Sequence, residues 1–148
     1  MLWLQFGAHV SAPTERDPER VTGQFALHLQ CPWRISSRHG IVVGSSDLYV
    51  PRDTDAPEYM FDPNVPGHAI ADLHLSRWIA AYVTRPLVVV GINVDRCSGF
   101  VLRLSEGFAI EVFPNSSDPT HESEEWRLLR PGQDIPHFVV RSGGAAPE

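Results

Sequence analysis

The sequence predicts an α+β fold: a single domain of 148 residues in which one amphipathic helix packs on a strongly bent antiparallel sheet of about eight strands. Three observations support this fold class. Apolar residues recur at every second position in the strands expected within residues 87–114 and 24–36, as in strands with one buried face. In residues 68–84, the apolar residues recur instead at the spacing of one helix face. Three strands, one helix and five strands are therefore expected along the chain, an order typical of α+β domains.

The first part of the chain contains two predicted strand regions. Residues 1–10 alternate apolar and polar side chains, which predicts a first strand. Residues 24–50 predict a hairpin region, whose first strand spans residues 24–36 and whose second continues toward Val50. Pro32 lies within the first of these strands. Because proline cannot donate a backbone hydrogen bond, it indicates a sheet edge or a bulge at this point.

A loop and a helix come next. Residues 51–66 are rich in proline and acidic side chains, and this composition predicts a long irregular loop, a kind of segment that is often functional. Residues 68–84 predict the helix, with Pro66 near its start and Pro86 after its end. Its apolar face comprises Ala71, Leu75, Trp78, Ile79 and Tyr82.

Residues 87–141 predict five strands, and the register of the first three follows from parity. A three-residue loop at residues 105–107 places Leu104 opposite Phe108, with Gly107 where such a loop needs a left-handed residue. Six side chains then share one buried face: Phe100, Leu102, Leu104, Phe108, Ile110 and Val112. A register slip of one residue would expose this set, which is costly when one face is buried.

The remaining strands extend this pattern on both sides. Val94 is expected opposite Phe100, at the end of a strand whose alternating positions are Val88, Val90, Ile92 and Val94. Two further strands are expected near residues 126–130 and 137–141, and residues 142–148 are expected to form a flexible tail.

The charge of the chain narrows the classes of function. The formal net charge is −6, and all twelve basic residues are arginine. The absence of lysine excludes lysine Schiff-base chemistry and a Walker-A phosphate site. An acidic total argues against nonspecific nucleic-acid binding, which needs a basic face, and it favours docking onto a basic protein partner.

Two further observations concern the setting of the protein. No stretch of apolar residues is long enough for a membrane span, and the N-terminal residues lack the basic region of a signal peptide. A cytoplasmic location is therefore expected. Cys31 and Cys97 lie in or beside apolar strands, so we expect both to stay reduced and structurally inert.

The acidic loop offers oxygen ligands of the kind that hard cations take. These are Asp53, Asp55, Glu58 and Asp62. Their spacing differs from that of an EF-hand and prolines stiffen the loop, so a solvated loop is the favoured interpretation. The histidines and cysteines also lack the spacings of zinc sites. No metal and no other cofactor are expected.

Two functional hypotheses follow for the polar residues. In the first, the chain is a noncatalytic protein-binding module, with Glu122, Glu124 and Glu125 steering a basic partner toward an anchoring Trp126. In the second, it is a small enzyme or ligand-binding protein with a pocket in the curved sheet. His28 or His137 would then exchange protons with a carboxylate. The carboxylates considered for this role are Asp47 and Glu111.

Two segments carry a resemblance to a known group of proteins. One segment reads Glu-Val-Phe-Pro from Glu111, then Glu-Trp-Arg-Leu-Leu-Arg-Pro-Gly from Glu125 and His-Phe-Val-Val from His137. The other reads Cys-Pro-Trp-Arg-Ile from Cys31, followed by Gly-Ile-Val-Val-Gly from Gly40. Both resemble small uncharacterised proteins of actinobacterial type, some of which act as immunity or partner proteins. The resemblance implies an immunity-type or accessory partner of a basic protein, and it carries over no catalytic residues. It leaves the oligomeric state open.

Overall fold

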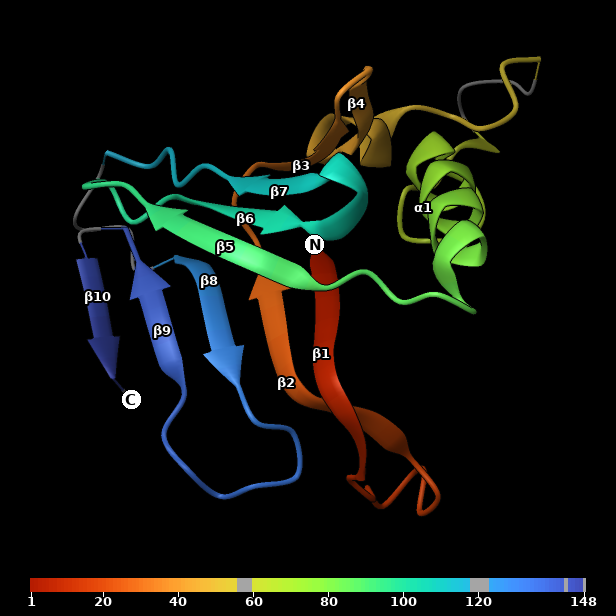
Figure 1. Cartoon of the computed structure of the whole chain (residues 1–148). Helices are drawn as coiled ribbons and strands as arrows, with labels where there is room; N and C mark the ends of the chain where they lie inside the picture. Colours follow the sequence, from red (N-terminus) through yellow and green to blue (C-terminus); the bar gives the residue numbers. More distant parts are fainter. Residues whose placement is uncertain (56–59, 118–122, 143, 148) are drawn as a thin grey trace. The chain divides into compact units, whose positions relative to one another are not determined.

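The computed structural model of the chain describes residues 1–55, 60–117, 123–142 and 144–147. Within these residues it contains one α-helix and ten β-strands, arranged in two antiparallel sheets of five strands each (Figure 1). The chain divides into two compact units: Met1–Cys31 together with Pro114–Glu148, and Pro32–Phe113. The α+β class and the antiparallel pairing are as predicted, whereas the prediction of one continuous sheet is wrong.

The first unit contains the sheet with the strand order β1-β2-β8-β9-β10. Its strands are β1 (Leu2–Ser11), β2 (Val21–Leu29), β8 (Glu124–Leu129), β9 (Phe138–Arg141) and β10 (Gly144–Pro147). β1 confirms the predicted first strand. β10 pairs with β9 along its whole length, where we expected a flexible tail. Those backbone hydrogen bonds explain the difference, because a paired segment does not fray.

The predicted strand over residues 24–36 is two strands in different sheets. β2 ends at Leu29, and β3 (Trp33–Ser37) belongs to the second unit. Between them, the N–H groups of Gln30 and Cys31 both donate to the C=O of Glu125, at 2.9 and 3.0 Å. Pro32 then has no N–H to offer a ladder. The sheet therefore breaks at the point where the proline predicted an irregularity.

The second unit contains the sheet with the strand order β4-β3-β7-β6-β5. Its other strands are β4 (Gly40–Gly44), β5 (Val89–Val94), β6 (Phe100–Leu104) and β7 (Ala109–Val112). The predicted register of the meander is confirmed by three cross-strand pairs, Phe100 with Val112, Leu102 with Ile110, and Val94 with Phe100.

The predicted apolar face of the meander is also confirmed. Five of its six side chains are buried, and Phe108 is half-buried. In the loop η3 (Ser105–Gly107), Gly107 adopts a φ of 77°, as predicted, and Glu106 adopts a φ of 60°. Both residues are therefore in the left-handed region, which sets the tight reversal between β6 and β7.

Helix α1 (Ile70–Tyr82) forms within the predicted range. Asp72 caps its start, since its carboxylate accepts hydrogen bonds from the N–H groups of Gly67 at 2.8 Å and Ala69 at 3.3 Å. The rings of Trp78 and Tyr82 meet Phe108 edge-on, at 5.8 and 5.3 Å between centroids. These contacts fix the helix to the β6–β7 end of the sheet. Within the described part of the chain, no helix has the length and apolar character needed to span a membrane.

The return strand ends earlier than predicted. Residues Ser45–Tyr49 form the 3₁₀ turn η1 instead of continuing β4 toward Val50. The carboxylate of Asp47 accepts the N–H of Gly44 at 2.9 Å, which closes this turn. The chain before and after the acidic loop is held together, because Pro51 at the start of the loop forms a β-bridge with Ala69, three residues beyond its end.

Candidate functional site

Four polar side chains form a network on the sheet of the first unit. Arg127 donates to Glu124 from Nε at 2.7 Å and also from Nη2. His28 lies directly across from Arg127 on the neighbouring strand, with its Nδ1 3.5 Å from Oε1 of Glu124. The Nη1 of Arg127 reaches Nδ1 of His137 at 3.1 Å. The structure thus brings together both of the histidines that the sequence singled out.

The chemistry of this network is that of a structural cluster. Because arginine only donates hydrogen bonds, Nδ1 of His137 must accept, which places the proton of its neutral ring on Nε2. The hydrogen bond from Arg127 holds the pKa of Glu124 below its usual value. A carboxylate stabilised in its charged form is a weak proton acceptor. The Nε2 atom of His28 is buried and has no hydrogen-bond partner among the described residues.

The two carboxylates that were predicted to work with these histidines belong to the second unit, where each has other partners. Glu111 accepts from Arg34 at 2.9 and 2.5 Å and from the hydroxyl of Ser36 at 2.8 Å. The hydrogen bond from Arg34 lowers the pKa of Glu111. Asp47 closes η1, and His74 lies 4.0 Å from its Oδ2. Within that unit, both carboxylates serve local structure.

The predicted partner-binding residues that the structure describes, Glu124, Glu125 and Trp126, are buried or half-buried. Glu122 lies outside the described residues. The side chain of Glu124 is 11% exposed, and Glu125 is 5% exposed. Trp126 is half-buried, with its ring 5.6 Å from that of Phe138. The steering role of these glutamates stays a prediction, and their burial does not favour it.

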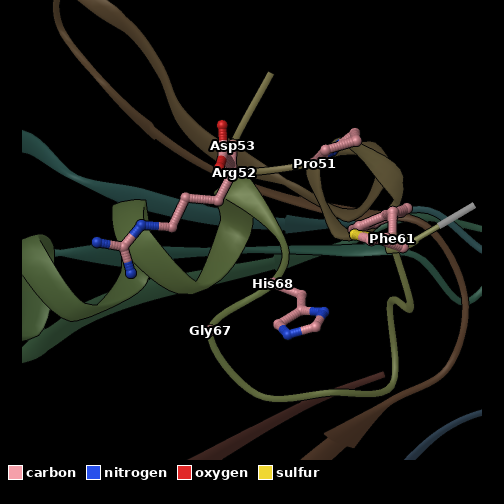
Figure 2. A pocket seen from close by; sticks show the side chains of 7 residues that line it. Pro51, Arg52, Asp53, Phe61, Gly67 and His68 are labelled. Carbon is pink, nitrogen blue, oxygen red and sulfur yellow. The ribbon is translucent and has the colours of Figure 1, made fainter. Parts of the chain in front are cut away.

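The acidic loop contains a cavity of about 500 Å³. Its lining is Pro51, Arg52, Asp53, Met60, Phe61, Gly67 and His68. Figure 2 shows that the guanidinium of Arg52 and the imidazole of His68 extend in different directions, so that these two polar groups do not converge on one point. A specific polar ligand would need such convergence.

Two of the four carboxylates weighed as cation ligands in this loop accept local backbone hydrogen bonds. A carboxylate oxygen of Asp53 accepts the N–H of Asp55 at 3.0 Å, and one of Asp62 accepts the N–H of Asn64 at 2.8 Å. Glu58 lies outside the described residues. Across residues 1–55, 60–117, 123–142 and 144–147, no three acidic, histidine or cysteine side chains are grouped as a metal site would require.

The most unusual surface is the edge formed by β5. This strand, green in Figure 1, ends the sheet order and pairs only with β6 among the described strands. Five large apolar side chains on and beside it are 42–66% exposed. They are Val88, Val89, Val90, Ile92 and Val94. The segment 88–94 contains no charged residue and no proline. Natural edge strands usually carry such residues, because they block pairing with other chains.

The backbone of β5 presents open hydrogen-bonding groups at this edge. The N–H of Asp95 donates to the C=O of Gly99 at 2.9 Å, so Asp95 faces β6. Backbone groups in an antiparallel pair alternate between the partner strand and the opposite side. Asn93 therefore also faces β6, while the N–H and C=O groups of Ile92 and Val94 point to the open edge.

Sequence reasoning missed this edge, because the alternation of Val88, Val90, Ile92 and Val94 indicated a buried face. A second signal was present in the same segment. Val89 is also apolar, so residues 88–90 form a continuous apolar run and not an alternating pattern. Strands of this kind are normally covered on both sides. Here the position of β5 at the end of the sheet leaves its apolar side chains exposed.

The two cysteines differ in exposure: Cys31 is buried, whereas Cys97 is exposed. Neither forms a disulfide among the described residues. Protein that is denatured without reductant should therefore titrate two thiols, and native protein should react first at Cys97, since access governs thiol reactivity. A titration that finds no thiol would contradict the expected reduced state and weaken the expectation of a cytoplasmic location.

Comparison with known proteins identifies no relative. No family model matches the chain, and neither a curated protein nor a solved structure is similar enough to count as a match.

Proposed function

We propose that this chain is a noncatalytic protein-binding domain whose partner adds an extended strand at β5. The observation that carries the proposal is the exposed apolar edge at Val88–Val94, with the open backbone groups of Ile92 and Val94. Strand addition of this kind takes its affinity from main-chain hydrogen bonds and its specificity from alternate side chains.

A strand added at β5 gains free energy from two contributions. Each new backbone hydrogen bond adds about 0.5–1.5 kcal/mol net. Covering an exposed aliphatic side chain adds up to about 1.5–3 kcal/mol when burial is complete. Ile92 and Val94 offer both contributions at adjacent outward positions of one strand. Together, these contributions act against the cost of ordering a short extended segment at the edge.

The wider properties of the partner stay as the sequence predicts them. The net charge of −6 favours a basic protein as the partner. An immunity-type or accessory role in the cytoplasm is consistent with such a partner. The alternative, a small acid–base enzyme, has less support. Its carboxylate candidates are held by arginine or by a turn, and Glu124, which does meet His28, is held by Arg127.

A peptide probe tests the binding edge directly. The probe is an octapeptide amide, Arg-Thr-Val-Thr-Val-Thr-Val-Arg, whose β-branched residues favour an extended chain. Added to ¹⁵N-labelled protein at low micromolar concentration, it should shift the amide signals of residues 88–95. It should also protect the Ile92 and Val94 amide hydrogens from exchange. The same peptide with glutamate at both ends should bind more weakly if the partner is basic.

Two substitutions at one position distinguish pairing at the strand edge from nonspecific hydrophobic binding. Val94→Pro removes an N–H that points away from β6, so that the existing ladder is kept while the open edge loses a donor. This variant should lose peptide binding. Val94→Thr keeps the donor and the β-branched shape, and it should bind like the natural chain. Equal binding by both variants, or signal changes far from β5, would overturn the proposal.

A further inference from the structure

We infer that the strand added at β5 is β5 of a second copy of this chain, paired antiparallel about a two-fold axis at Asn93. The inference rests on the strand addition proposed for this edge, and it names a second, acidic copy of the chain in place of the basic partner that the net charge alone favours. A symmetric pair requires an edge that is complementary to itself. Residues 91–95 meet this requirement in their backbone and on both of their faces.

The backbone groups select the register. Ile92 and Val94 are the β5 residues whose N–H and C=O groups point to the open edge, so they are the ones that can form hydrogen-bonded pairs with another strand. With Asn93 on the axis, Ile92 of each copy faces Val94 of the other copy. Each of these two pairs exchanges two hydrogen bonds. All of the open groups at the two positions are then satisfied.

Neighbouring registers of the same parity are poorer. Moving the axis to Ile92 would bring Val90 into the ladder, where the β5–β6 pairing is interrupted by a bulge between Val89 and Gly91. Moving it to Val94 would place Ile92 opposite Arg96, which lies beyond the end of β5. Only the axis at Asn93 pairs both open residues with each other.

The apolar face of β5 fits this register. Ile92 and Val94 lie across from Leu102 and Phe100 of β6, so all four side chains share one face. Leu102 and Phe100 are buried, whereas Ile92 and Val94 are exposed. In the pair, Ile92 of one copy lies beside Val94 of the other, at the ~4.5–5.5 Å between Cβ atoms that is usual for facing residues. The second copy therefore extends an apolar face that already exists.

The other face supplies polar complementarity. The two Asn93 side chains face each other across the axis, and an amide can donate to and accept from a second amide. Gly91 faces Asp95 of the second copy. The guanidinium of Arg103 fills the space above Gly91, 2.7 Å from where a Cβ would stand. Each Arg103 would then lie at the register position beside the Asp95 of the other copy, whose carboxylate accepts the N–H groups of Cys97 and Gly99 within its own turn at 2.7 and 2.9 Å.

Sedimentation measurements test the dimer. At 0.15 M salt, where the mutual repulsion of two acidic chains is screened beyond ~8 Å, the natural chain should be dimeric at high micromolar concentration. Val94→Pro should weaken the dimer at least about tenfold, since two copies of the N–H donor are lost. Val94→Thr should dimerise within about threefold of the natural chain. Circular dichroism and thermal melting establish that each variant is folded.

A charge swap tests the axis itself. Asn93→Asp places two carboxylates opposite each other, and Asn93→Lys places two ammonium groups there, so each variant alone should dimerise poorly. A one-to-one mixture of the two should recover the dimer, because each mixed pair joins opposite charges. Recovery is expected only if Asn93 meets Asn93. Single variants that dimerise normally, or a mixture that stays monomeric, would overturn this register.

The outcomes distinguish the inference from the proposed function. If the chain stays monomeric up to about 0.5 mM, an upper range for weak association, while the octapeptide still binds at β5, the second copy is overturned and strand addition stands. If neither occurs, both are overturned. A dimer that persists in the Val94→Pro variant uses another surface, and it also overturns the inference.

Discussion

Replacing Ile110 with alanine should lower the free energy of unfolding by about 2–5 kcal/mol. Ile110 is 2% exposed and lies in β7, between Ile35 of β3 and Leu102 of β6. Both neighbouring strands are held by ladder hydrogen bonds, so the space left by the missing carbons cannot close fully. Denaturation by urea, followed by circular dichroism, measures the loss.

The matched control is Ile92→Ala at low micromolar concentration. Ile92 lies on the same face as Ile110, since both pair with Leu102, but it belongs to the edge strand and is 56% exposed. Its truncation should therefore cost less than about 1 kcal/mol, as exposed positions usually do. If the two variants were equally destabilised, β5 would be covered in solution, and the binding edge would lose its basis.

The local part of the fold could be predicted because it depends on parity and short loops. The register of Phe100 with Val112 follows from the three-residue loop at Ser105–Gly107, and the helix follows from its apolar spacing. The division into two sheets could not be predicted in the same way. It depends on the N–H groups of Gln30 and Cys31, which donate to the C=O of Glu125, a residue distant in the sequence.

The candidate sites show the same limit. His28, Arg127 and Glu124 meet because β2 pairs with β8, and no local pattern announces that pairing. The exposure of β5 depends likewise on its place at the end of the strand order, whereas its own residues resemble those of a covered strand. Residue types indicate which groups need a hydrogen-bond or packing partner, but the order of strands in the sheet determines which of these groups have one.

Replacing Glu124 with glutamine should lower the free energy of unfolding at pH 7 by about 1.5–3 kcal/mol, the range for a hydrogen bond that involves charged groups. Glutamine keeps the shape of the side chain and one acceptor, but it loses the charge that Arg127 and His28 face. The exposed pair of Glu106 with Arg85 provides the control. Glu106→Gln should change stability by no more than about 1 kcal/mol, because surface ion pairs are screened by water.

The dependence on pH gives this prediction its sign. The hydrogen bond from Arg127 keeps the pKa of Glu124 in the folded protein below its unfolded value, which is ~4.3. The stabilisation is therefore complete above that unfolded value, and it is lost as the pH falls through the lower folded value. The natural chain should approach the stability of the Glu124→Gln variant on acidification below about pH 4. Glu111 also has a lowered pKa, but it is present in both proteins, so its effect cancels in the difference. Urea titrations of both proteins between pH 7 and pH 3 measure that difference, and one that stays constant over this range would show that the charge of Glu124 does not stabilise the fold.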